Sequence, residues 1–162
     1  MSRKPDGPRL RPSLLDCFSD AAEGGPASMS PGDLKRALVR DISTLLNASG
    51  LEQVVDLSDY PYVANSTLNF GSPALDGQHR EGLDLYHVQE GVARSLHRFE
   101  PRLMPDTLRV TSADDPGQGA IVLRIEGEIR ADPAPLRVVM RTEVEAEMPA
   151  IRVVECRDEG FA

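Results

Sequence analysis

The hydrophobic pattern of this chain changes its period at one short stretch, and that change constrains the fold more than any other feature. Before Phe99, apolar side chains recur at the spacing of an amphipathic helix; after Pro105, they alternate with polar ones as in a half-buried strand. Pro101 lies between the two patterns. Proline ends a helix because it lacks an N–H and pushes the preceding residue out of helical dihedrals. The sequence therefore predicts an α+β protein.

Two long helices are predicted before this stretch. The first begins near Asp33, where Ser30 and Asp33 are candidate caps, and it ends within residues 47–50. The second runs roughly from Glu81 to Phe99. Their apolar stripes are Leu34, Leu38, Ile42, Leu45 and Leu46 in the first helix, and Leu85, Val88, Val92, Leu96 and Phe99 in the second. Each helix thus has one face to bury.

A connection of residues 51–77 separates the two helices and shows no regular periodicity. Loops of this length without structure of their own are usually functional or pinned down by packing. We expect Tyr60, Tyr62, Leu68 and Phe70 to anchor it in the core.

The C-terminal third predicts a small antiparallel sheet on which the N-terminal helices pack. A short strand lies near Leu108, and "AIRVVE" forms the last one. Two longer strands alternate cleanly. Their core-facing positions are Ile121, Leu123, Ile125 and Ile129 in the first, and Leu136, Val138 and Met140 in the second. A sheet that ends in a C-terminal strand has an edge, and an unpaired edge is a template for strand addition.

The length of 162 residues suits one domain, which we place at residues 13–157. Residues 1–12 are rich in proline and basic side chains and are predicted to form a flexible tail; residues 158–162 form a second tail. No apolar run approaches the ~20 residues that cross a bilayer. We expect a cytoplasmic protein without direct membrane insertion.

The formal net charge of -8 and an aromatic content of 4% argue against nucleic acid as a partner. Cys17 and Cys156 are expected to be reduced and unlinked. His87 and His97 are ten residues apart on one predicted helix, about 15 Å along its axis, which is too far for a shared metal. We therefore predict no metal site and no cofactor.

No motif for catalysis is present, and we predict that the chain is not an enzyme. A glycoside hydrolase needs a pair of acids around its substrate. Glu143, Glu145 and Glu147 alternate along a predicted strand, which is typical of a solvated face. Asp114 and Asp115 lie in a loop with proline and glycine. None of these acids is predicted to lie in an apolar cleft.

Four stretches occur in a fixed order: "PSLLDCF", "DLKRALVRDISTLLNA", "STLNFG" and "HRFEPRL". Together they resemble the TssE family of type VI secretion baseplate components, which is related to a wedge protein of contractile phage tails. The resemblance covers residues from about 12 to 156. One departure is Cys17, where these relatives usually carry a base.

The resemblance implies a structural protein of the baseplate wedge, located in the cytoplasm on the inner face of the inner membrane. Its implied partners are TssF, TssG and TssK in the baseplate, and TssB and TssC in the contractile sheath, whose polymerisation it would template. Three alternatives stay open: a peptidoglycan hydrolase of lysozyme type, a wedge protein of a phage-like contractile particle, and a small regulatory binder with the same fold.

The signature of the resemblance is the triplet Glu100, Pro101 and Arg102. Phe99 and Leu103 flank it and are expected to plug into the core. Pro101 stiffens the backbone, which aims the two charges at low entropic cost. The triplet then either forms an assembly site, with Arg102 binding a wedge partner through bidentate bonds, or acts as a clamp inside the domain.

Overall fold

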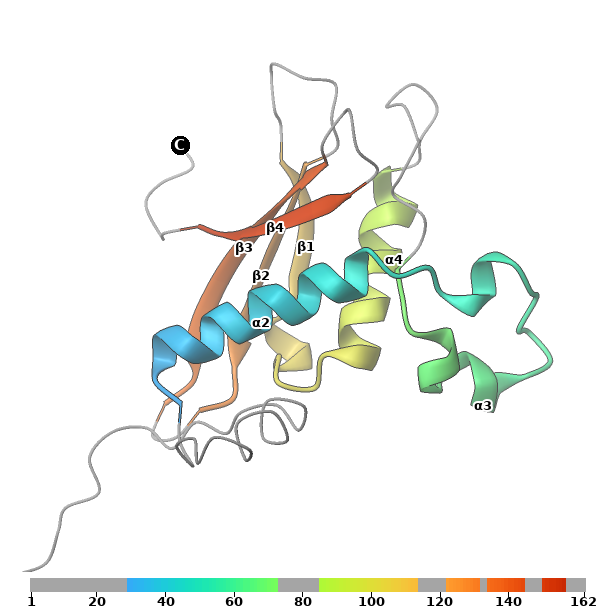
Figure 1. Cartoon of the computed structure of the whole chain (residues 1–162), viewed down its shortest axis with the longest axis horizontal. Helices are drawn as coiled ribbons and strands as arrows, with labels where there is room; N and C mark the ends of the chain where they lie inside the picture. Colours follow the sequence, from blue (N-terminus) through green and yellow to red (C-terminus); the bar gives the residue numbers. More distant parts are fainter. Residues whose placement is uncertain (1–28, 73–84, 114–121, 132–133, 145–149, 157–162) are drawn as a thin grey trace, which may run out of the picture.

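The computed structural model describes residues 29–72, 85–113, 122–131, 134–144 and 150–156 (Figure 1). The α-helices are α2 (Pro31–Leu46), α3 (Pro61–Ala64) and α4 (Leu85–Phe99). The 3-10 helices are η1 (Leu51–Gln53), η2 (Thr67–Asn69) and η3 (Pro105–Thr107). The strands are β1 (Arg109–Ala113), β2 (Val122–Ile129), β3 (Leu136–Val144) and β4 (Ile151–Glu155). The predicted tails, Cys17 and residues 81–84 lie outside the described residues.

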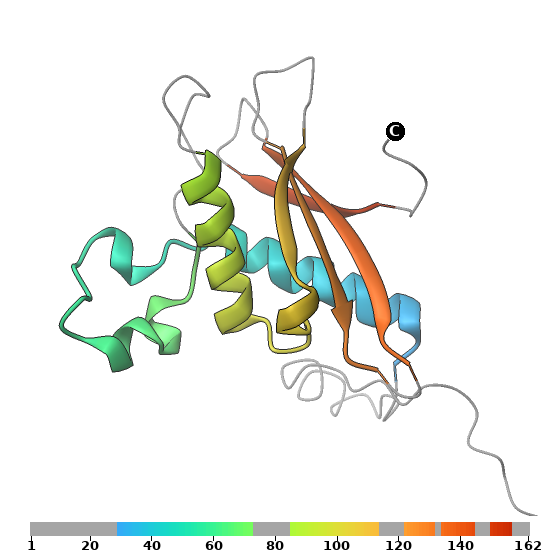
Figure 2. The same ribbon diagram turned by 180° about the vertical axis from the view of Figure 1, so that it is seen from behind.

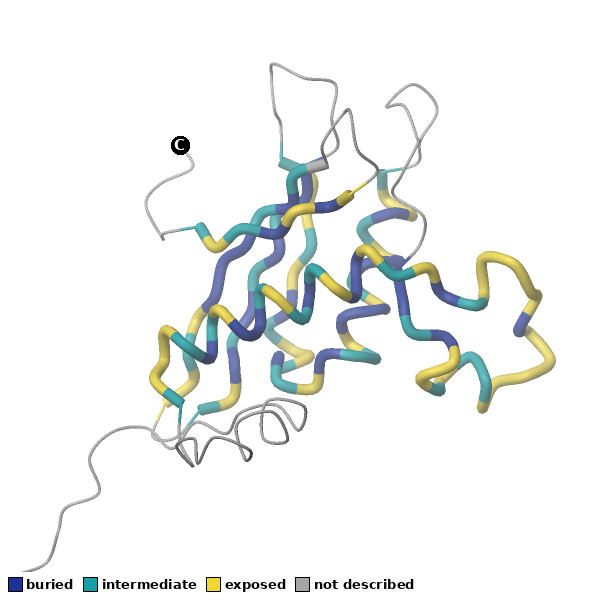
Figure 3. Tube along the Cα trace, in the orientation of Figure 1, coloured by how far each residue is buried: buried dark blue, intermediate teal, exposed yellow. Residues whose placement is uncertain are grey.

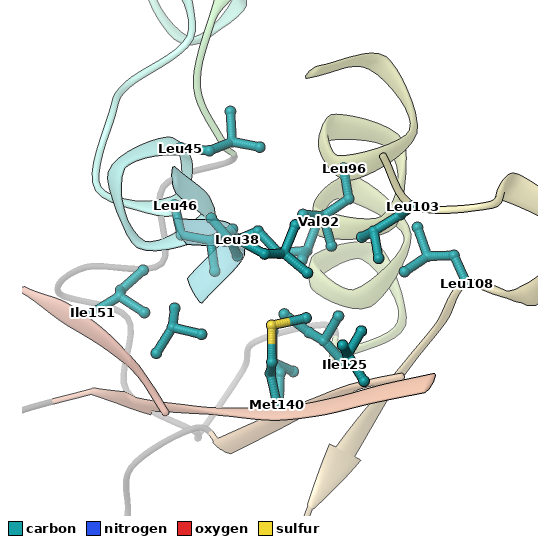
Figure 4. Close-up of a cluster of buried hydrophobic side chains, with 14 of the residues drawn as sticks. Leu38, Leu45, Leu46, Val92, Leu96, Leu103, Leu108, Ile125, Met140 and Ile151 are labelled. Atoms are coloured by element: carbon teal, nitrogen blue, oxygen red, sulfur yellow. The ribbon is translucent and has the colours of Figure 1, made fainter. Parts of the chain in front are cut away.

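The predicted α+β architecture is confirmed. The strands form one antiparallel sheet in the order β1-β2-β3-β4, so β1 and β4 are its edges. Helices α2 and α4 lie over the same face, and the core fills the space between them and the sheet (Figure 4). The core is mainly aliphatic, as the composition requires. Among the described residues, none of the helices has the length and apolar character that crossing a bilayer requires.

The predicted start of the first helix and the predicted end of the second are confirmed. At the start of α2, the Asp33 backbone N–H donates to Ser30 Oγ at 3.1 Å, and the Ser30 N–H donates to the Asp33 carboxylate in return. This capping box satisfies donors that a helix N-terminus leaves free. The hydrogen bond from Ser30 lowers the pKa of Asp33. Helix α4 ends at Phe99, where Pro101 predicted its end.

The predicted alternation is also confirmed in β2 and holds in part in β3, where Val139 is buried as well. In β2, Leu123, Ile125 and Ile129 are buried, and the charged residues between them are partly exposed. In β3, Val138 and Met140 are buried in the same core. The sheet is therefore positioned by the period-2 pattern that the sequence shows.

The prediction for the long connection was wrong in two respects. The segment has structure of its own, because η1, α3 and η2 follow one another within it. Tyr60, Tyr62 and Leu68 are exposed rather than in the core, and only Phe70 packs against the core. We call residues 51–70 the lobe. The lobe projects from the side of the two-layer body, away from the sheet (Figures 1 and 2).

Hydrogen bonds, rather than inserted aromatic side chains, fix the lobe. Asn69 is only 2% exposed, and its Oδ1 accepts the Glu52 backbone N–H at 2.9 Å. Its Nδ2 donates to the Ala64 carbonyl and to the Glu52 carboxylate, each at 3.0 Å. One buried amide thus ties the start, middle and end of the lobe together, which explains how exposed side chains coexist with an ordered backbone.

Gly71 closes the lobe onto the end of α2. Its φ of 151° is one that side chains rarely adopt, and a Cβ there would lie 2.3 Å from Gly50 N and 2.5 Å from Ala48 O. The adjacent Ser72 N–H donates to Ala48 O at 2.9 Å. The backbones approach so closely that only glycine fits.

We predict that Gly71→Ala lowers the free energy of unfolding by on the order of 3 kcal/mol, because strain and overpacking act together. Urea unfolding would measure it. Gly32→Ala is the control, because a Cβ there meets only side-chain atoms at 3.7 Å or more. Equal stability of the two variants would contradict the close approach.

Candidate functional site

The Glu100-Pro101-Arg102 triplet lies at the junction between α4 and the sheet. The Arg130 N–H donates to Arg102 O at 3.1 Å, and the Met104 N–H donates to Glu128 O at 2.8 Å. These two bonds flank the bridge between Leu103 and Ile129, so the chain leaving α4 pairs at once with the end of β2. The triplet backbone is therefore fixed by the sheet as well as by proline.

The flanking apolar residues behave as expected. Leu103 is buried in the core, and Phe99 is partly buried against it. The Phe99 ring meets the Phe70 ring edge to face, with centroids 5.3 Å apart. This aromatic pair joins the end of α4 to the end of the lobe. Two of the four stretches that carry the resemblance thus touch in the fold.

The two charges of the triplet bind each other. Arg102 Nε donates to Glu100 Oε1 at 2.6 Å, and Arg102 Nη2 donates to Glu100 Oε2 at 2.5 Å. The Arg102 backbone N–H donates to Glu100 Oε1 as well, at 3.2 Å. Glu100 is only 5% exposed, and the Arg102 side chain 18%. A bidentate pair of this kind is specific in geometry as well as strong.

A third residue, Asp41 of α2, completes the network. Its Oδ2 accepts a hydrogen bond from Arg102 Nη2 at 2.8 Å, while Oδ1 accepts one from Arg40 Nε at 2.9 Å. Burial by itself lowers the pKa of Arg102, but the bonds and charges of Glu100 and Asp41 outweigh it and raise that pKa above its ordinary value. We call Glu100, Arg102 and Asp41 the clamp.

The bonds of the triplet fit the internal alternative, and its role as an assembly site stays a prediction. The clamp joins the end of α4 to the middle of α2 through hydrogen bonds within the domain. The sequence did not single out Asp41 of the first helix. Its partner is 61 positions away in the chain, and no local pattern indicates such a pair.

The clamp is not suited to glycoside hydrolysis. Glu100 is the only buried carboxylate among the described residues, and both of its oxygens are bonded to Arg102. Glu143 lies 3.3 Å from Arg141 and is partly exposed. Glu145, Glu147, Asp114 and Asp115 lie outside the described residues. Nor do three potential metal ligands cluster anywhere in the described part of the chain, which includes His87 and His97.

The outer edge of β4 is a second candidate site. Cys156 N–H donates to Val139 O at 2.9 Å, and hydrogen-bonded pairs alternate along an antiparallel ladder. The backbone groups of Ile151, Val153 and Glu155 therefore point away from β3. Each edge strand has a helix packed against it: α4 lies beside β1 (Figure 2), and α2 packs against β4.

Asn47, the C-cap of α2, occupies one end of this edge. Its Oδ1 accepts the Ile151 N–H at 2.8 Å, and its Nδ2 donates to Ile151 O at 2.7 Å. No described segment pairs with the outward groups of Val153 and Glu155. The outward groups without a described partner therefore begin at Val153, which is itself only 6% exposed. Sequence reasoning missed Asn47, the residue that occupies the edge at Ile151.

We predict that Arg102→Ala lowers the free energy of unfolding by about 3–5 kcal/mol, because it leaves the buried Glu100 carboxylate without its partner. Glu100→Ala should cost less, because Arg102 keeps its bond to Asp41. The double variant should lose less than the sum of the two. Thermal or urea unfolding of the purified chain would measure all three.

Arg94→Ala is the matched control for the clamp. Arg94 pairs with Glu90 at 3.8 Å, but both side chains are about half exposed. An exposed pair of this type contributes about 0–1 kcal/mol. Arg102→Ala unfolding as late as Arg94→Ala would refute the clamp.

Comparison with known proteins agrees with this architecture. A family model described as baseplate wedge protein gp25 matches residues 32–134, which is more than half of the chain and includes both long helices, the lobe, the clamp, β1 and β2. Neither the curated proteins nor the solved structures give a match. TssE proteins are members of the same family, so the resemblance seen in the sequence is confirmed at that level. The chain belongs to the gp25 family of baseplate wedge proteins and is a component of a phage-tail-like baseplate.

Proposed function

We propose that the chain is the TssE-type component of a type VI secretion baseplate, and that it docks on TssF-, TssG- and TssK-like proteins and templates the TssB–TssC sheath. Membership of the wedge family supports a structural role. The four stretches, in TssE order, favour the secretion system over a phage-like particle, which is the second candidate. This function places the chain in the cytoplasm at the inner membrane.

The outer edge of β4 is the part of the molecule that best fits a template. Strand addition needs unpaired backbone N–H and C=O groups in a row, and Val153 and Glu155 direct theirs outward. Asn47 stops the row at Ile151, so an incoming strand would take its register from Val153 onward. That geometry is the single observation that carries the templating role.

The clamp would then act on assembly indirectly. It holds α2, and α2 supplies both the Asn47 cap at Ile151 and the ion pair between Lys35 and Glu155 at 2.9 Å. We infer that loss of Glu100 or Arg102 reduces sheath formation because α2 and the edge of β4 are no longer held in place.

Co-purification from the native cytosol tests the proposed function. TssF-like and TssG-like proteins should accompany a tagged full-length chain, and deletion of the gene should abolish fluorescent sheaths. Co-purification with phage-type tail proteins alone would favour the second candidate. Hydrolysis of purified peptidoglycan that is lost on changing a single acid would overturn a structural role.

We predict that Glu155→Pro abolishes sheath assembly in cells that express fluorescent sheath protein. Proline removes the outward N–H of residue 155 without taking a bond from the β3 ladder, and edge strands tolerate proline. Glu155→Ala is the control, because it removes the pair with Lys35 but keeps the N–H. Normal sheath numbers in Glu155→Pro, with a normal melting temperature, would exclude this edge as the template.

A further inference from the structure

The lobe carries most of the large apolar side chains that the described residues expose. Tyr62 is 92% exposed, Val54 80% and Leu68 71%, and Tyr60 and Val55 are exposed as well. Outside the lobe, only Tyr86 of α4 belongs to this group. Single exposed apolar residues are ordinary, but a concentration of five within one short segment marks an interaction surface.

These side chains are held outward by an ordered scaffold. Leu57 is buried, and Asn69 ties the two ends of the lobe together. Gln53 Nε2 donates to Ser72 O at 2.5 Å, which fixes the lobe to the segment that follows it. A partner would not have to order this surface on binding, and that lowers the entropic cost of association.

The charge of the lobe has one sign. Residues 51–70 contain Glu52, Asp56 and Asp59 and no lysine or arginine. Asp56 accepts hydrogen bonds from the Ser58 hydroxyl at 2.6 Å and the Ser58 N–H at 3.0 Å, and these lower its pKa. Asp56 and Asp59 are both exposed, so the apolar surface has an acidic border.

Much of the lobe backbone is hydrogen-bonded within its own turns, unlike the edge of a sheet. Its turns close on themselves: the Tyr60 N–H donates to Leu57 O, the Ala64 N–H to Tyr60 O, and the Asn69 N–H to Ser66 O. This favours binding through side chains, as when an amphipathic helix lays its apolar face on a complementary surface. Exposed stretches run along the outer rim of the lobe, away from β4 (Figure 3).

We propose that the lobe is a docking surface for a basic amphipathic helix of a partner protein. The apolar face of that helix covers Tyr62, Leu68 and Val54, and its lysine and arginine side chains meet Asp56 and Asp59. Tyrosine is enriched at the centres of such interfaces, and opposite charge at the border steers the encounter. This contact is separate from strand addition at β4 and does not depend on it.

Site-specific photocrosslinking identifies the occupant. The full-length chain, with a benzophenone amino acid at position 62, is irradiated in its native cells, and the adduct peptide is mapped by mass spectrometry. We expect one partner protein, joined through a helical segment with a net positive charge. An adduct with a second copy of this chain, with an acidic or extended segment, or with no protein would overturn the proposal.

The mapped segment is then synthesised and titrated against the purified full-length chain by fluorescence anisotropy. The double variant Tyr62→Ser/Leu68→Ser should bind at least tenfold more weakly, and Asp56→Lys/Asp59→Lys at least fivefold. Wild-type affinity should fall as salt rises. Tyr86→Ser is the control and should bind as the wild type does, because Tyr86 is an exposed tyrosine outside the lobe.

Melting temperatures establish that the lobe variants fold, as the exposure of the changed side chains predicts. Folded variants of the lobe that bind the peptide as well as the wild type would refute the surface. Glu155→Pro should bind the peptide normally. Sheath counts therefore test the β4 edge, and peptide affinity tests the lobe, so that a failure of one proposal is distinguished from a failure of the other.

Discussion

The bidentate pair between Arg102 and Glu100 is the interaction on which the rest of the structure depends. It lies where a helix must end and a sheet must begin, and it reaches Asp41 on the other helix of the same layer. Two buried charges are costly unless each satisfies the other, so this junction admits one arrangement and disfavours alternatives. Pro101 restricts the backbone dihedrals at this point, and the Glu100 and Arg102 side chains therefore leave the chain in set directions.

From this junction the molecule presents two surfaces of different chemistry. The edge of β4 offers backbone groups in a row, and Asn47 determines where that row begins. The lobe offers apolar side chains bordered by acids, on a backbone that is already closed. Such a division would let one small domain bind an added strand and a side-chain partner at separate places, as proposed above. Helix α2 adjoins both surfaces, because its C-cap Asn47 bonds Ile151 of β4 and the end of the lobe closes onto Ala48.

Much of the fold follows from local sequence. The apolar stripes of both helices and the alternation in β2 predicted burial correctly, because these periods are those of the elements themselves. The lobe shows where such reasoning fails. Tyr60, Tyr62 and Leu68 were expected in the core because they are large and apolar, but a hydrogen-bonded amide at Asn69 makes their burial unnecessary for order. Residue type does not reveal whether a loop is anchored by its side chains or by its backbone.

The sequence by itself determined where α4 ends, that a sheet follows, and that Glu100 and Arg102 flank a rigid proline, since each depends on neighbours a few residues away. Only the tertiary structure decided what those charges bind. Asp41 is 61 positions from Arg102, and Asn47 is 104 positions from Ile151. No local period encodes contacts over such separations. They form when the two helices pack on one face of the sheet, because the packing of that shared core determines which polar groups meet.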